Sequence, residues 1–175
     1  RESATSDGVL THYFVDKDTP TGTCAVLVKE GERSLIANLA AANNFKPEHL
    51  ETDKAKEIVA SSKVYYSAGF FLTVSVESLT TVAKQFTEEN KIFCLNFAAP
   101  FIIDFFADQV ATALSYADFV FANESEAAAY GKKHELGDDI EKVSACLSSH
   151  TGGAVISRIF KALSRKPLHA HNNTL

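Results

Sequence analysis

The sequence predicts an α/β fold with a parallel sheet and an appended β-hairpin, and two observations lead to it. After Lys46 and Pro47, short apolar runs typical of strands alternate with helical stretches as far as about His150. Alternating strands and helices with short joints imply right-handed crossovers and a parallel sheet with helices on both faces. Before Lys46 the sequence has strand character only, which favours a hairpin that extends from the sheet as a flap.

The part before Lys46 contains three segments with strand character. They are VLTHYFV (9–15), TCAVLVKE (23–30) and RSLIANL (33–39). The second and third are predicted to pair as a hairpin, with Glu30, Gly31 and Glu32 at the turn.

Three apolar runs are predicted to build the parallel sheet, namely VYYSAGF (64–70), IFCLNF (92–97) and DFVFAN (118–123). The clearest helix between them is predicted over 75–89, because apolar residues recur there at helical spacing: Val76, Leu79, Val82, Ala83 and Phe86. From Thr151 the composition becomes basic and includes histidines. We expect structure there over AVISRIF (154–160) at most, and loose final residues.

Composition excludes several classes of partner. The chain has 22 acidic and 17 basic residues and a net charge of -5, which argues against nucleic acid or an anionic membrane surface as the main ligand. No apolar run reaches the roughly 20 residues that span a bilayer. The three cysteines are widely spaced and fit a reducing compartment. We therefore expect a cytoplasmic location, with the nucleus left open as a second compartment.

Ligands of open parallel sheets bind at the carboxyl ends of the strands, so these ends are the candidate site. Phe70 follows the first strand, Asn96 and Phe101 follow the second, and Asn123 and Glu126 follow the third. Aromatic rings on two neighbouring strand ends could enclose a flat heterocycle, and the third end offers an amide and a carboxylate. This combination suits a nucleoside and a hydrated metal ion.

Structural roles compete with these functional ones. The chain has 13 phenylalanines, and core packing is the more common role for any one of them. Asn123 and Glu126 also have the spacing of a capping box at the start of a helix. Capping does not exclude a ligand role, because a helix N-terminus also attracts phosphate and its cation.

Five motifs occur in order, namely PTGTCA, RSLIANLAAAN, AGFFLTVS, NFAAPFI and NESEAAAY. From about Asp7 to Leu147 the chain thereby resembles the middle of adenosine kinases, which are members of the ribokinase-like (PfkB) carbohydrate kinase family. The resemblance implies a ribokinase-like three-layer α/β/α fold with a small β lid, incomplete at both ends. It divides the chain into lid and connection (7–45), partial core (46–150) and divergent basic tail (151–175).

The resemblance also implies a reaction. Adenosine kinases transfer the γ-phosphoryl group of ATP to the 5′-hydroxyl of adenosine, giving AMP for purine salvage, with Mg²⁺ as the cofactor. Carried over by position, the implied substrate-binding residues are Cys24, Leu35, Ala37 and Leu39 in the lid and Phe70, Val74 and Phe101 in the core. Alternation places Leu35, Ala37 and Leu39 on one strand face.

The implied phosphate side consists of Arg33, Asn96 and Asn123. Asn123 and Glu126 would orient the waters of Mg²⁺, and the network would act by placement and charge stabilisation. For Arg33, a surface position beside a turn is an equally good interpretation.

The family's ribose-binding Asn and Asp, its glycine anion hole and its general base have no counterpart in this sequence, so no catalytic residue is assigned. The chain starts at Arg1 without any Met, and we interpret it as an internal fragment. We expect it to be inactive alone and to expose a sheet edge.

Two alternatives stay open. One is a ribokinase-like kinase for another sugar or nucleoside. The other is a non-catalytic nucleoside-binding or dimerisation module. For the full-length enzyme the resemblance implies adenosine and ATP as partners and a monomeric state.

Overall fold

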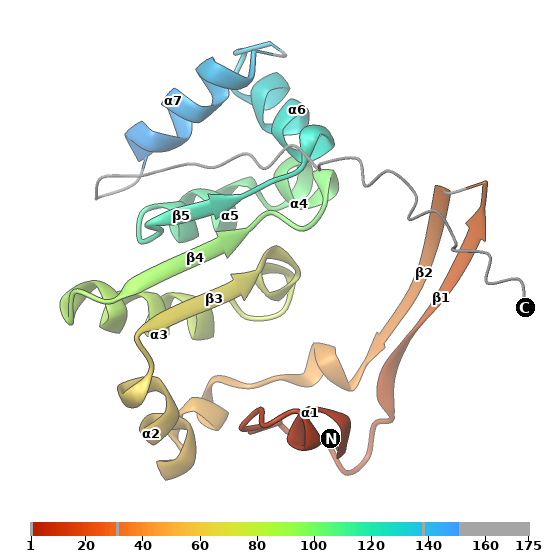
Figure 1. Cartoon of the computed structure of the whole chain (residues 1–175), viewed down its shortest axis with the longest axis vertical. Coiled ribbons are helices and arrows are strands. Elements are labelled where there is room, and N and C mark those ends of the chain that lie inside the picture. Colours follow the sequence, from red (N-terminus) through yellow and green to blue (C-terminus); the bar gives the residue numbers. More distant parts are fainter. Residues whose placement is uncertain (1, 31, 138, 151–175) are drawn as a thin grey trace, which may run out of the picture.

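A computed structural model describes residues 2–30, 32–137 and 139–150, and it contains a separate hairpin and a parallel sheet (Figure 1). A short helix α1 (Glu2–Ser6) precedes the hairpin, which consists of β1 (Thr21–Lys29) and β2 (Glu32–Ala40). The connection to the sheet carries two 3-10 turns and one helix: η1 (Ala41–Asn44), η2 (Pro47–Glu51) and α2 (Asp53–Ser61).

The rest of the described chain alternates strands and helices as predicted. Its elements are β3 (Val64–Ala68), η3 (Gly69–Thr73), α3 (Val76–Glu88), β4 (Ile92–Asn96), α4 (Pro100–Phe105), α5 (Ala107–Leu114), β5 (Phe119–Phe121), α6 (Glu124–Lys133) and α7 (Ile140–His150). The sheet has the order β3-β4-β5, and both neighbouring pairs are parallel. This confirms the predicted α/β class.

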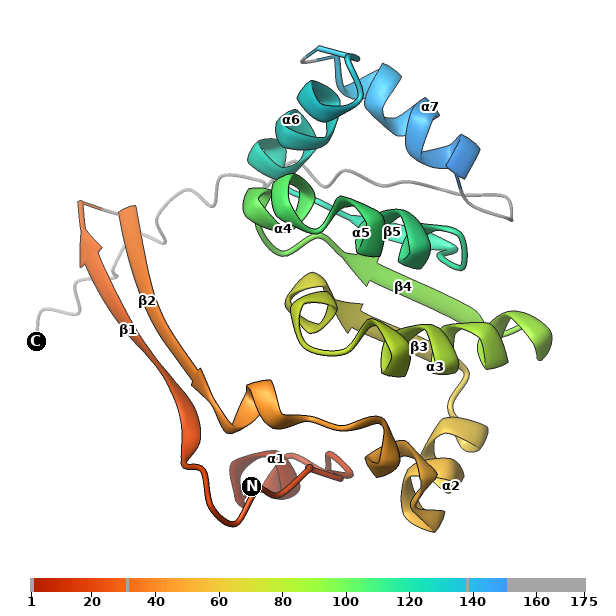
Figure 2. The same cartoon turned by 180° about the vertical axis from the view of Figure 1, so that it is seen from behind.

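Helix α3 shows why these segments fold as they do. Its apolar residues fall on one helical stripe, so Leu79, Ala83 and Phe86 are buried against the sheet. The Ser75 hydroxyl caps the helix by accepting from the Ser78 amide at 3.2 Å. Helices α3 and α5 lie behind the sheet in Figure 1 and in front of it in Figure 2, so they cover the same face.

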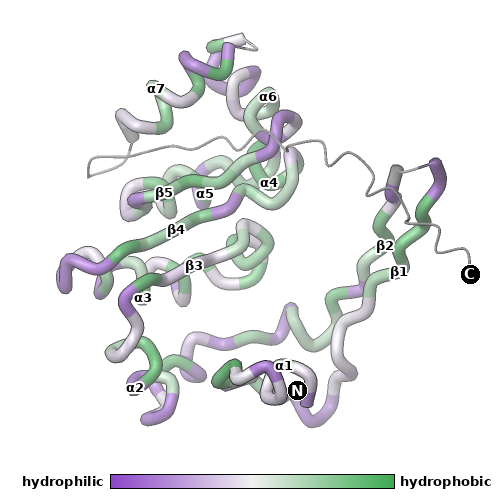
Figure 3. The backbone as a smooth tube through the Cα atoms, in the orientation of Figure 1, coloured by the Kyte–Doolittle hydropathy of each residue, from purple (hydrophilic) through white to green (hydrophobic). Residues whose placement is uncertain are grey.

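The hairpin is apolar on both of its faces. Cys24 pairs with Ala37 and Val26 with Leu35, which places these side chains on one face. Leu27 and Ile36 lie on the other face and are exposed as well. Apolar colour accordingly runs along the hairpin as it does along β4 and β5 (Figure 3). Gly31 of the predicted turn lies outside the described residues.

One predicted strand is wrong, because residues 9–15 form no strand. A strand needs a neighbouring backbone to satisfy its amides and carbonyls, and this segment instead packs through its aromatic rings. Phe14 contacts the rings of Phe45 and His49 edge to face, and His12 stacks on His49 with ring centroids 4.6 Å apart. The predictions for the tail at 151–175 lie outside the described residues. None of the described helices has the length and apolar character needed to cross a membrane.

Candidate functional site

The carboxyl ends of β3, β4 and β5 lie at one edge of the sheet, and this edge faces the hairpin in both Figure 1 and Figure 2. Gly69 joins two of these ends. A Cβ atom at Gly69 would lie 2.4 Å from the carbonyl oxygen of Phe97 and 2.7 Å from that of Asn96. Only glycine allows the segments after β3 and β4 to approach so closely.

Two aromatic residues come shortly after the contacting segments in the chain and form a pair. Phe70 in η3 and Phe101 in α4 have ring centroids 5.9 Å apart, at an angle of 50°. Their exposed fractions are 47% and 42%, so neither ring is part of the buried core. Val74 comes directly after η3 and is partly buried. The pair offers apolar ring surface at the carboxyl edge of the sheet.

The third strand end holds a complete capping box at the start of α6. The Asn123 side-chain oxygen accepts from the Glu126 amide at 2.9 Å. The Glu126 carboxylate accepts from the Asn123 amide at 3.0 Å and from the Asn123 side-chain NH₂ at 2.9 Å. Capping is therefore a real role of both residues.

The same pair limits how a metal ion could bind. Glu126 is 3% exposed, and both of its carboxylate oxygens already accept hydrogen bonds. No group of three or more His, Cys, Asp or Glu side chains within the described ranges could hold a metal ion. Hard oxygen donors suit Mg²⁺, and in this pair Asn123 is exposed whereas Glu126 is buried, so Glu126 would reach such an ion only through water.

Asn96 links the second strand end to the third. Its side-chain NH₂ donates to the Phe121 carbonyl at 3.4 Å, two residues before Asn123. Asp118, at the opposite end of β5, accepts from the Phe93 amide at 2.8 Å and fixes the register of β5 against β4. Burial, followed by the nearby Asp118 charge, raises the pKa of the Cys94 thiol and keeps it protonated.

The hairpin presents the other predicted residues. Leu35, Ala37 and Leu39 share a face with Cys24, and Arg33, opposite Val28, lies on the same face. All five are exposed, and the hairpin stands apart from the sheet (Figures 1 and 2). The structure therefore brings together Phe70 with Phe101 and Asn123 with Glu126, and it leaves the hairpin residues away from both pairs.

Two strained backbone positions border the site and were missed in the sequence. Ala40 at the end of β2 has φ 43°, and Ala98 after β4 has φ 66°. Alanine rarely adopts positive φ values, so surrounding contacts hold both residues there. Only glycine or asparagine at these positions would have given a signal, and the sequence has neither.

Comparisons with known proteins agree with this arrangement. Residues 1–158 match the model of the pfkB family carbohydrate kinases. The chain is 49% identical over 144 residues to an adenosine kinase of Dictyostelium discoideum, covering 82% of this chain and 42% of that protein. It is 47% identical over 149 residues to adenosine kinase 1 of Arabidopsis thaliana, covering 85% and 43%. The chain thus spans less than half the length of these curated relatives.

Solved structures give the same picture. The crystal structure of Anopheles gambiae adenosine kinase in complex with P1,P4-di(adenosine-5) tetraphosphate has a TM-score of 0.87 and 38% identity, covering 91% of this chain and 49% of that one. Adenosine kinase from Schistosoma mansoni with adenosine in an occluded loop conformation has a TM-score of 0.79 and 33% identity, covering 84% and 43%.

Proposed function

Because the chain belongs to the pfkB family of carbohydrate kinases, we propose that it is part of an ATP-dependent kinase that phosphorylates the 5′-hydroxyl of adenosine. The half-exposed pair Phe70–Phe101 at the carboxyl edge of the sheet is the observation that carries the proposal. Flat apolar rings at this place suit a purine, whereas a sugar alone would call for polar groups. The adenosine kinases among the relatives support the same choice of substrate.

On this proposal, the hairpin acts as a lid. Cys24, Leu35, Ala37 and Leu39 form an exposed apolar face that would cover the nucleoside opposite Phe70, Phe101 and Val74. Closing the hairpin would remove apolar surface of both sides from water, at about 25 cal/mol per Å². Closure would also exclude water from the phosphates and so reduce hydrolysis of ATP.

The phosphate side would lie at the start of α6. The exposed Asn123 side chain and the first amides of this helix favour an anion there, with Asn96 on the neighbouring strand end. Arg33 lies on the same hairpin face as the lid residues and would approach the phosphates on closure. Mg²⁺ bound to ATP would neutralise phosphate charge, and Asn123 and Glu126 would orient its waters.

A chimeric enzyme tests the proposal. The 144 residues of the Dictyostelium discoideum adenosine kinase that align with this chain would be replaced by the corresponding residues of this chain. We expect the chimera to phosphorylate adenosine at a rate within about tenfold of the parent enzyme. A folded chimera that ignores adenosine but phosphorylates a sugar or another nucleoside would contradict the choice of substrate.

A further inference from the structure

The chain turns from β4 into α4 at one residue, Ala98. Its φ is 66°, and the Ala99 amide donates to the Phe97 carbonyl at 2.8 Å. A hydrogen bond between residues two positions apart makes this a γ-turn, and γ-turns with a positive central φ are the rarer and more strained kind. A residue with a Cβ atom stays in such a turn only where neighbouring contacts hold it.

The residue before the turn is held firmly. The Phe97 amide donates to the Phe121 carbonyl at 3.0 Å. The Phe97 ring is fully buried and stacks on Tyr130, with ring centroids 5.5 Å apart. The Phe97 carbonyl also lies against Gly69, where a Cβ atom would be only 2.4 Å away. Phe97 therefore has no room to shift and relieve the strain at Ala98.

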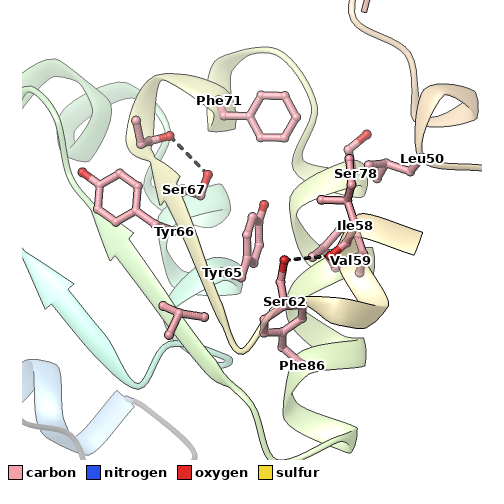
Figure 4. Close-up of a pocket in the computed structure, with 13 residues that line it drawn as sticks. Leu50, Ile58, Val59, Ser62, Tyr65, Tyr66, Ser67, Phe71, Ser78 and Phe86 are labelled. Atoms are coloured by element: carbon pink, nitrogen blue, oxygen red, sulfur yellow. Dashed lines mark hydrogen bonds between the residues drawn. The ribbon is translucent and has the colours of Figure 1, made fainter. Parts of the chain in front are cut away.

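The segment that carries Phe70 is held from its other side. Phe71, the next residue in η3, lines one pocket together with Tyr65 and Ser78 (Figure 4). The ring of Phe71 also contacts that of Phe45 edge to face, with ring centroids 5.2 Å apart. One side of the aromatic pair is thus anchored by residues outside the pair.

The start of α4, which carries Phe101, is held less firmly. Among the described residues, no side chain caps this helix start. Pro100 and Phe101 are both exposed, and the first side chain of α4 that is buried in the core is that of Ile102. The course of the chain between Phe97 and Ile102 therefore depends on the backbone at Ala98.

We propose that Ala98 is a positioning residue, which holds the Phe101 ring beside Phe70 for contact with the ligand. The inference rests on the proposed function, because the ligand is taken to be the purine of adenosine. Glycine would adopt a φ of 66° without strain, but it would also reach many other backbone conformations. Alanine at this turn therefore costs stability and limits where the Phe101 ring can lie.

Glu135 offers a matched comparison. Its φ is 58°, so it is also a residue with a side chain in the left-handed region. It follows α6, at the opposite end of this helix from Asn123, and has no part in the proposed site. Replacement of either residue by glycine should relieve strain, but only Ala98→Gly should loosen an aromatic ring at the carboxyl edge of the sheet.

A fluorescent probe tests the placement without any substrate. The 175-residue chain has no Trp, so Phe101→Trp introduces a single indole at the position of interest. In this background, Ala98→Gly should increase the amplitude of the sub-nanosecond anisotropy decay by about 1.5-fold or more, because the ring moves more freely. Glu135→Gly should leave that amplitude within about 10% of its starting value. No increase in Ala98→Gly, or an equal increase in both variants, would overturn the proposal.

Kinetics of the chimera test the consequence for the substrate. Ala98→Gly should raise the KM for adenosine by about threefold or more and leave kcat within about twofold, because stacking on Phe101 is the same in the ground state and the transition state. Its unfolding midpoint in urea should be no lower than that of the parent chimera, because relief of strain offsets the added freedom of the unfolded chain. In a Phe101→Ala background, Ala98→Gly should change the KM by less than about 1.5-fold, because the ring that Ala98 positions is absent.

The control variant Glu135→Gly should change the KM by less than about 1.5-fold. An unchanged KM in Ala98→Gly, an equal rise in Glu135→Gly or an equal rise in the Phe101→Ala background would each contradict the role of Ala98. So would a lower unfolding midpoint of Ala98→Gly, because Ala98 would then not be strained. A chimera without activity on adenosine contradicts the proposed function instead, and the indole probe then tests the placement of residue 101 by itself.

Discussion

At the residue scale, the Asn123 side chain has two roles, one structural and one proposed for ligand binding. It caps α6 through its oxygen, and its exposed amide is the proposed contact on the phosphate side. Serine is a good N-cap residue but lacks the amide, whereas alanine lacks both functions. Substitution at this position can therefore separate folding from function.

We predict that in the chimera Asn123→Ala lowers the free energy of unfolding by about 1 kcal/mol, whereas Asn123→Ser changes it by less than about 0.5 kcal/mol. Adenosine phosphorylation should fall in both variants, because each removes the amide. Chemical denaturation and steady-state kinetics measure the two effects. Full activity of Asn123→Ser would leave capping as the only role.

Residue-level features differed in how far the sequence could predict them. The capping box was predictable because Asn123 and Glu126 are three residues apart, and helical geometry fixes what that spacing does. The contact of Gly69 with the carbonyls of Asn96 and Phe97 was not, because it joins residues that are distant in the chain. The residue pattern around Gly69 does not show which distant backbone segment lies against it.

At the scale of elements, the two faces of the hairpin offer a matched comparison. Leu35 and Ile36 are neighbours in β2, with exposed fractions of 58% and 65%, and they point to opposite faces. Only the Leu35 face carries the proposed substrate contacts. A charge placed on either face should be tolerated by the fold to a similar degree.

We predict that Leu35→Glu in the chimera raises the KM for adenosine by about tenfold or more, because a carboxylate would be buried against the purine when the lid closes. Ile36→Glu should change the KM by less than about twofold. Circular dichroism of both variants controls for folding. A larger effect at Ile36 would mean that the opposite face covers the substrate.

One carboxylate, that of Asp16, links the segment before the hairpin to the segment after it. Asp16 accepts hydrogen bonds from the Asn44 side chain at 2.7 Å and from the amides of Asp18 and Thr19 at 2.9 and 3.0 Å. These bonds, with that of Asn44 as the largest cause, lower the pKa of Asp16 to about 2. The unfolded chain has an ordinary aspartate pKa of about 4, so the stabilisation is complete above pH 4 and is lost as the pH falls to 2.

We predict that Asp16→Asn makes the loss of stability between pH 4 and pH 2 less steep. Asp104→Asn is a suitable control, because no hydrogen bond of the Asp104 carboxylate occurs among the described contacts. Unfolding by urea at a series of pH values provides the measurement. An unchanged slope in Asp16→Asn would show that the pKa of Asp16 is not lowered in the folded chain.

Most of the described elements were predictable because their patterns are local. The three sheet strands and the helix over 75–89 have clear apolar periods, and their parallel order follows from alternation. The strand predicted at 9–15 was wrong because Phe14 in this segment packs against the rings of Phe45 and His49. Periodicity cannot tell a strand from an extended segment that packs through aromatic rings.

At the scale of the whole molecule, we predict that the 175-residue chain alone shows no measurable phosphorylation of adenosine. The sequence motifs assign no general base and no anion hole to it, and an enzyme without these groups would lose several orders of magnitude in rate. The measurement is ADP release with adenosine and MgATP. Turnover that disappears in Asn123→Ala would contradict us, whereas turnover that is the same in this variant would come from a contaminating kinase.

The close contact at Gly69 has a consequence for how this molecule can change over generations. The segments after β3 and β4 are held backbone against backbone there, so a side chain at 69 could be accepted only if 96–98 moved at the same time. Drift in one segment is thereby restrained by the other, and both must diverge together. The distance between Phe70 and Phe101 is then inherited as a unit.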